Sequence, residues 1–516
     1  MLKDTIYTQN LMKKQLVKNS ISGLVQFIIT ALLTLFCIPL FINNLGSETY
    51  GVFAMTSVIG NLSIFTNLGL NSSLIKFIAE QGKSEESDYD VTISVILVTI
   101  FLIPITFICY FFEEFILINI LGIPFHFYNQ VEVLYNCLLL SNLLLFVANI
   151  FGAVLSARQK TYILNYTQMI YSLIYWGLII LILLNGYNLK EIGFITLFSS
   201  IFWFIMILFF SLKEWNGRLT LIGIKSNFIR IVKKQLNYGY KIYLAGLITL
   251  LYEPLTKILI ANLIGIKEVG FFEIALKIRS YVISIISKAM QPLLPLLAEL
   301  KNNEKIRLLV HDLTQKGLFL ALPLILLIIF CTKPFLSLWL DHDVDIISTS
   351  IIYIAGVFLI TVTSTPNFQY LTVKNLVEKT IYIQLMNVFV NAIVIILFFK
   401  HLGYFSVILG NTVAILSAFT LNIYYQNKYL KSLIFDTRIQ LFKFILTALI
   451  SFGMVFIFNL FVKIIILKLI LTPLIIASII VFLYRYFGLI TEIDVNRYFY
   501  KDGWIKNKTK FLFLKN

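Results

Sequence analysis

Charged side chains are scarce in this sequence of 516 residues. Asp, Glu, Lys and Arg make up 13% of it, against roughly a quarter in ordinary soluble domains. Hydrophobic residues make up 59%. This composition leaves no room for a soluble catalytic domain.

Cysteine, histidine and nucleotide-binding motifs are equally sparse, so we predict that the chain is not an enzyme. All four cysteines lie inside hydrophobic stretches, which argues against a disulfide framework or a zinc motif. They are Cys37, Cys109, Cys137 and Cys331. The four histidines lie in or beside predicted loops on different sides, so no metal site is expected. No Walker motif is present, and ATP hydrolysis by this chain is therefore not supported.

What the sequence does contain is a series of long apolar runs. A hydrocarbon core of about 30 Å needs about 20 helical residues. Runs of about that length predict an all-α polytopic membrane protein with 14 transmembrane helices. We expect the spans at 19–42, 47–72, 91–112, 131–155, 162–184, 191–211, 241–264, 268–298, 317–341, 347–366, 380–399, 402–425, 440–461 and 465–488.

Basic residues alternate between the connections. Every second connection, beginning with residues 1–18, contributes to a total of 29 Lys and Arg, whereas the other connections hold four. Cytoplasmic loops carry this excess, so both termini are predicted to be cytoplasmic in a multi-pass protein of the cytoplasmic (inner) membrane. The net charge of +16 then reflects contact with anionic lipid headgroups, and no nucleic-acid partner is expected.

The longest polar interior connection divides the predicted spans. Residues 212–240 hold six basic residues and are interpreted as a cytoplasmic linker between an N-terminal lobe, 1–211, and a C-terminal lobe, 241–425. Residues 426–516 form an extra helix pair and a basic tail. Two glycines bracket an acidic residue in both Gly46–Gly51 and Gly265–Gly270, which is the pattern expected of two parallel six-helix repeats.

Several motifs resemble those of polysaccharide flippases in the multidrug/oligosaccharidyl-lipid/polysaccharide exporter superfamily. They are Gly46 to Ile78 with Tyr50-Gly51, Asn67-Leu68-Gly69-Leu70 and Lys76; Tyr238-Gly239 leading to Asn262-Leu263 and then Glu268 to Phe272; and Asn391 followed by Leu402-Gly403-Tyr404. The resemblance implies two six-helix lobes around a central cavity plus a C-terminal helix pair. It also implies that the protein flips a polyprenyl-diphosphate-linked oligosaccharide from the inner to the outer leaflet, for O-antigen, capsule or a similar surface polysaccharide.

Ionisable residues concentrate in spans 7 and 8, where each costs about 2.5–3.5 kcal/mol at a central position on insertion scales. Such groups usually face a cavity or a partner. The candidates for binding the diphosphate and anionic sugars are Lys257, Lys277, Arg279, Lys288 and the neighbouring Tyr281. Two further candidates, Glu253 and Glu273, would bind the H+ or Na+ whose movement drives transport. No cofactor other than this coupling H+ or Na+ is expected.

Each of these interpretations has a structural alternative. Glu253 and Lys257 stand four residues apart and could form a neutralised pair, and Lys288 could extend to the membrane surface. Uncharged polar stripes occur in spans 1, 4 and 11, with Gln26, Asn142 and Asn387 as candidate sugar contacts. Such stripes are more often interhelical hydrogen bonds.

Competing functions are a multidrug exporter of the same fold, a membrane polysaccharide polymerase or glycosyltransferase, and an adaptor without transport. An exporter of cationic drugs predicts an acidic and aromatic cavity, whereas the charge within the spans is mainly basic. A polymerase predicts a long external loop with catalytic side chains, and 113–130 offers only Glu113, Glu114 and His126. The expected partners are the lipid-linked oligosaccharide, membrane lipids, a polymerase and other polysaccharide-assembly proteins.

Overall fold

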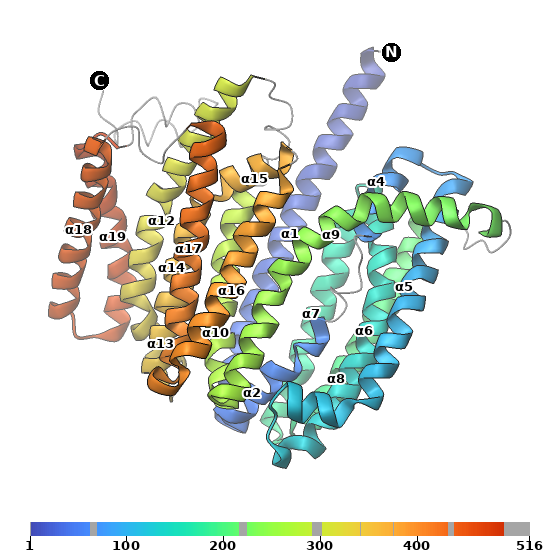
Figure 1. Cartoon of the computed structure of the whole chain (residues 1–516), viewed down its shortest axis with the longest axis horizontal. Helices are drawn as coiled ribbons and strands as arrows, with labels where there is room; N and C mark the ends of the chain where they lie inside the picture. Colours follow the sequence, from blue (N-terminus) through green and yellow to red (C-terminus); the bar gives the residue numbers. More distant parts are fainter. Residues whose placement is uncertain are drawn as a thin grey trace. The chain divides into compact units, whose positions relative to one another are not determined.

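The described part of the chain is helical nearly throughout. The computed structural model describes residues 2–61, 70–215, 224–290, 302–340, 342–374, 376–431 and 438–489. Long helices joined by short turns make up this described part, which contains no β-strand (Figure 1). The predicted all-α class is confirmed.

Contacts between residues divide the chain into two units, 1–273 and 274–516. The division falls within one helix, α10, and the lobe boundaries drawn from the sequence remain a prediction. The first unit contains α1 (Leu2–Leu45), α2 (Ser47–Thr56), η1 (Ile59–Asn61), α4 (Leu70–Gln81), α5 (Glu85–Phe111), η2 (Phe115–Ile120), η3 (Phe125–Phe127), α6 (Tyr128–Ala157), α7 (Thr161–Leu184), α8 (Leu189–Trp215), α9 (Ile224–Leu263) and the first third of α10 (Ile266–Met290).

The second unit is built around α12 (Asn303–Trp339), which α13, α14, α15, α18 and α19 all contact. In Figure 1 the pair α18 and α19 lies beside α12. The remaining elements of this unit are α13 (Val344–Ile351), η4 (Ile352–Gly356), α14 (Val357–Val362), α15 (Thr365–Val373), α16 (Val377–Leu402), α17 (Phe405–Leu430), α18 (Arg438–Phe461) and α19 (Ile465–Tyr486).

Ten described helices are long and apolar enough to cross a membrane. They correspond to the predicted spans 1, 3 to 6, 9 and 11 to 14. Large apolar side chains stand exposed along them, such as Phe107 and Phe209 in the first unit and Leu449 in the second. Exposed apolar faces of this extent suit lipid and not water, so the chain is a multi-pass membrane protein.

Two of the other predicted spans are interrupted where the sequence predicted one continuous helix. Span 2 (47–72) leaves the α-helix after Thr56, and span 10 (347–366) passes through the π-helical turn η4. Irregular backbone at membrane depth is tolerated only where protein or a cavity satisfies its polar groups. Around η1 the protein does so, because the amide of Asn142 on α6 donates to the Ile59 carbonyl at 2.7 Å.

The last two predicted spans, 7 and 8, are formed by α9 and α10, which carry more charge than the ten apolar helices. Helix α9 begins at Ile224, well before the predicted start of span 7 at 241. Most of the connection interpreted as a linker is therefore helical, because α8 also extends to Trp215. At a rise of about 1.5 Å per residue, the 40 residues of α9 extend about 60 Å, and Lys257 lies near the C-terminal end of this helix.

Candidate functional site

The ionisable side chains of α9 and α10 meet at Lys257. Its ammonium lies 2.8 Å from Oε1 of Glu253, one turn earlier on α9, and 2.6 Å from Oε2 of Glu273 on α10. The spacing of four residues predicted the first contact. Glu273 lies on the second turn of α10, which begins at Ile266, three residues after α9 ends at Leu263.

Burial differs sharply among the three charges of this Lys257 cluster. The Lys257 side chain is 2% exposed and that of Glu273 is 11% exposed, whereas Glu253 is 44% exposed. A buried ammonium is stable only when it is paired, and here two carboxylates surround it. With all three groups ionised the cluster carries one net negative charge.

The backbone of α2 completes the surroundings of Lys257. The carbonyl oxygen of Ala54 lies 3.5 Å from the ammonium and accepts a long hydrogen bond. Closer to the predicted outer end, the Asn262 amide donates to the Ile120 carbonyl at 2.9 Å. These contacts fasten the end of α9 to α2 and to the connection before α6.

Two glycines of the predicted repeat touch each other at this end. A Cβ at Gly51 on α2 would lie 1.9 Å from the carbonyl oxygen of Ile266, the first residue of α10. A Cβ at Gly270 would lie 3.1 Å from the Tyr50 ring and 3.3 Å from the Gly51 nitrogen. Gly51 and Gly270 are thus explained by close approach of two helices, whereas Gly46 has nothing within 4 Å and a φ of +88° instead.

The other predicted binding residues of span 8 lie further along α10 than Glu273. Lys277, Arg279 and Tyr281 are partly buried on α10, and Lys277 stands one turn beyond Glu273. The Lys288 side chain lies outside the described part of the structure. Their assignment to substrate remains a prediction.

Two of the three neutral candidates contact polar groups of the protein. The Gln26 amide donates to Thr30 at 3.2 Å, and the Thr30 hydroxyl donates to Ser172 on α7 at 3.0 Å. Asn142 is buried against η1, as described above. The contact of Asn142 joins two segments, whereas that of Gln26 lies within α1, and the assignment of both to sugar contacts remains a prediction. Asn387 differs, because its Oδ1 is buried and accepts no hydrogen bond from any described residue.

Sequence reasoning missed the part that α2 plays at this centre. The Ala54 carbonyl carries no signal in a sequence, because every residue has one. The Tyr50-Gly51 motif gave the one hint, since it singled out the glycine that α10 approaches. Among the described residues no three His, Cys, Asp or Glu side chains are arranged to hold a metal ion.

The chain matches a known protein family over more than half of its length. The sequence pattern of a family described as polysaccharide biosynthesis protein matches residues 16–301, which is more than half of the chain. No curated protein matches the sequence.

Solved structures share the fold. The lipid II flippase MurJ in an inward closed conformation matches with a TM-score of 0.69 and 17% identity, over 91% of this chain and 99% of that one. An inward-facing multidrug resistance MATE family transporter of the MOP superfamily matches with a TM-score of 0.59 and 16% identity, over 80% and 99%. The MATE transporter VcmN of Vibrio cholerae gives 0.58 and 15%, over 82% and 98%. At these identities the likeness establishes the fold alone.

Proposed function

Because the chain belongs to the polysaccharide biosynthesis protein family, we propose that it flips a polyprenyl-diphosphate-linked oligosaccharide from the inner to the outer leaflet of the cytoplasmic membrane. The observation that carries the proposal is the Lys257 cluster of α9 and α10, the two helices that correspond to predicted spans 7 and 8. A diphosphate headgroup cannot cross about 30 Å of hydrocarbon unaided, and its charge must be neutralised on the way.

In this proposal Lys257 exchanges partners during transport. Without substrate, Glu253 and Glu273 hold its ammonium, and the buried lysine stays paired. An arriving diphosphate, with more negative charge than either carboxylate, competes for the ammonium, while Lys277 and Arg279 supply further positive charge. Arg offers a planar fork for phosphate oxygens and Lys a mobile point charge.

The same exchange provides a means of coupling. When the diphosphate takes Lys257, the two carboxylates lose their counter-ion and become a site for a proton or Na+. One charge that crosses 100 mV supplies about 2.3 kcal/mol, which can drive the return step. We expect this movement to proceed by alternating access, with both termini cytoplasmic and no bond-making chemistry on the chain.

The multidrug exporter is the second candidate, because MATE transporters share the fold. Two observations favour the flippase. The family pattern matched by residues 16–301 is one of polysaccharide biosynthesis. The MurJ structure covers 91% of the chain, including residues that the 80% match to the MATE transporter leaves out. A role in O-antigen or capsule assembly, with a polymerase as partner, belongs to this same proposal.

The direct test is reconstitution in liposomes with a fluorescent short-chain polyprenyl-diphosphate glycan. A membrane-impermeant reagent that quenches the outer-leaflet fluorophore reports the rate of movement between leaflets. We expect Lys257→Met to lower that rate at least tenfold, and Lys190→Met, an exposed lysine at the start of α8, to leave it unchanged. Equal rates for wild type, both variants and protein-free liposomes would refute the proposal, whereas export of cationic drugs alone would assign the exporter function.

A further inference from the structure

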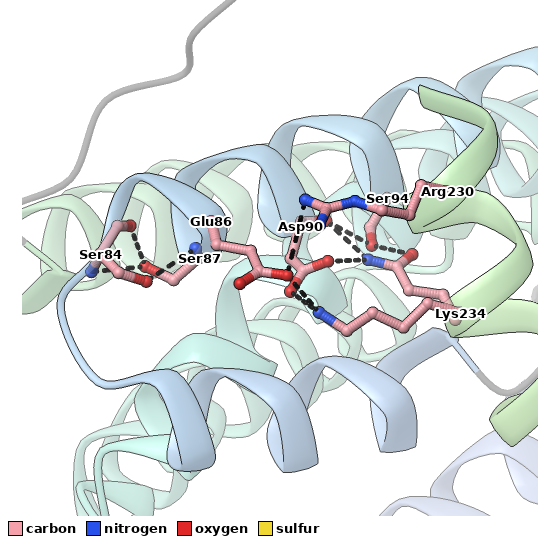
Figure 2. Close-up of polar contacts among 8 residues, drawn as sticks. Ser84, Glu86, Ser87, Asp90, Ser94, Arg230 and Lys234 are labelled. Atoms are coloured by element: carbon pink, nitrogen blue, oxygen red, sulfur yellow. Dashed lines mark hydrogen bonds and ion pairs between the residues drawn. The ribbon is translucent and has the colours of Figure 1, made fainter. Parts of the chain in front are cut away.

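A polar cluster fastens the beginning of α9 to α4 and α5, far along the chain from the Lys257 cluster. Helix α5 begins with a capping box, in which the Ser84 hydroxyl accepts from the Ser87 amide and the Ser87 hydroxyl accepts from the Ser84 amide. Such a box fixes the first turn of a helix. It therefore fixes where Glu86 and Asp90 stand on the face that α9 covers, as Figure 2 shows.

Asp90 is the buried centre of this cluster. Its side chain is 0% exposed, and its Oδ2 lies 3.0 Å from the Lys234 ammonium. The Gln235 amide donates to its Oδ1 at 3.2 Å. Both partners are on α9. A fully buried carboxylate is costly unless it is paired and hydrogen-bonded, so Asp90 holds these two residues of α9 in place.

Gln235 is held from three further directions. Its amide also donates to the Asp90 carbonyl at 3.0 Å, and its Oε1 accepts from the Ser94 hydroxyl at 2.9 Å. Its own backbone carbonyl accepts from the Ser73 hydroxyl of α4 at 2.9 Å. Gln235, Ser73 and Ser94 are all fully buried. Because each bond needs a particular position and rotation of α9, the helix cannot slide or turn here without breaking several of them.

At the rim of the cluster, acidic and basic side chains occur in equal number. Glu86 lies 3.3 Å from the Lys234 ammonium and 3.8 Å from the Arg230 guanidinium. With Asp90, the two acids match the two bases. Arg230 and Lys234 are among the six basic residues that the sequence assigned to a linker in contact with lipid headgroups. The structure pairs these two with carboxylates of α5 instead.

We propose that Asp90 and Gln235 form a permanent anchor that keeps the start of α9 on α4 and α5 throughout transport, so that α9 moves together with these two helices. From Gln235 to Lys257 the helix continues for 22 residues, with Pro254 inside it, or for about 33 Å. Asp90 and Gln235 are thus positioning residues, which set where Lys257 stands relative to Glu273. The transport assays below rest on the proposed function, whereas the attachment of α9 to α4 and α5 rests only on the hydrogen bonds and ion pairs described above.

A removable tether tests the anchor. In a variant with the four native cysteines replaced by alanine or serine, Glu86→Cys and Lys234→Cys are joined by a short bifunctional thiosulfonate that a reductant cleaves. Both positions are partly exposed. We expect the tethered protein to transport within twofold of its reduced form. A loss of more than tenfold that the reductant reverses would show that α9 leaves α5 during the cycle, and would overturn the proposal.

Rescue by the tether separates positioning from a general folding role. Asp90→Asn should lower transport at least fivefold, and adding the tether to it should restore most of that loss, because the tether replaces only the attachment. A variant that stays inactive when tethered, while its abundance equals that of wild type, would contradict the positioning role.

Hydrogen exchange keeps the anchor testable if the reconstituted protein transports nothing. The amides of 224–236 should exchange as slowly as those of α5 in the wild type, and at least tenfold faster in Gln235→Leu. Glu86→Gln, which alters only the rim, should change them less than threefold. Fast exchange of 224–236 in the wild type would refute the anchor whatever the protein transports, whereas slow exchange without transport would refute the function alone.

Discussion

The close contact between α2 and α10 makes Gly51→Ala the sharpest test of the fold. The new methyl group would lie 1.9 Å from the carbonyl oxygen of Ile266 and 2.8 Å from its carbon. Both are backbone atoms, which no side-chain rotation can move away. The two helix ends must therefore separate by about 1 Å, and overpacking of this kind costs about 1–3 kcal/mol.

The same substitution elsewhere provides the control. Gly177 lies inside α7, and no atom of a neighbouring residue stands within 4 Å of the place that a methyl group would take there. Gly177→Ala should therefore stabilise the helix by about 0.5–1 kcal/mol. Gly270→Ala should fall between the two, because its nearest contacts are at 3.1 and 3.3 Å. The free energy of unfolding should therefore be highest for Gly177→Ala, followed by the wild type, then Gly270→Ala, and lowest for Gly51→Ala.

Reversible unfolding in mixed detergent and dodecyl sulfate micelles, followed by tryptophan fluorescence, gives these free energies. All three variants replace glycine with alanine in a helix, so the differences report contacts and not propensity. If Gly51→Ala gained stability as Gly177→Ala does, then α2 and α10 would not touch as described, and the placement of the Lys257 cluster would fall with that contact.

Further predictions concern single side chains. Lys257→Met should cost about 3–5 kcal/mol by removing the cation that pairs with the buried Glu273, and adding Glu273→Gln should recover at least half of the loss in unfolding experiments. Asn142→Ala should cost about 1–3 kcal/mol, because the Ile59 carbonyl then stays buried without a donor, as the same unfolding assay would show. Glu113 lies in the connection after α5, where burial and then repulsion from a neighbouring glutamate raise its pKa above the ordinary 4.5, against a hydrogen bond that lowers it. Since the folded state binds the extra proton, stability should be highest below the unfolded pKa and fall as pH rises through the raised value; Glu113→Gln should remove that slope in unfolding measured from pH 4 to 8.

The apolar helices were readable from the sequence because a membrane imposes one length and one composition on them. Where span 2 and span 10 depart from a continuous helix, hydropathy gave no warning, since residues such as Ile59 are as apolar as their neighbours. What permits the break is a donor from another helix, Asn142, and such a partner lies more than 80 positions away.

The candidate site was partly predictable for a related reason. Glu253 and Lys257 are neighbours on one helix, and spacing alone brings them together. The pairing of Glu273 with Lys257 was not predicted, because it depends on how α10 is set against α9. Asp90 and Gln235 could not be paired in advance, because they are separated by 145 positions and each belongs to a segment that reads as an ordinary polar loop.

The central claim is movement of a lipid-linked diphosphate glycan between leaflets, and the leaflet in which that glycan accumulates tests it most directly. The gene is deleted in its native host, polyprenyl-diphosphate glycans are pulse-labelled, and their access to an external membrane-impermeant reagent is measured beside surface polysaccharide. The account predicts complete units trapped on the cytoplasmic side and little surface polymer. Normal access of those units in the outer leaflet, with altered polymer length or drug sensitivity, would contradict it.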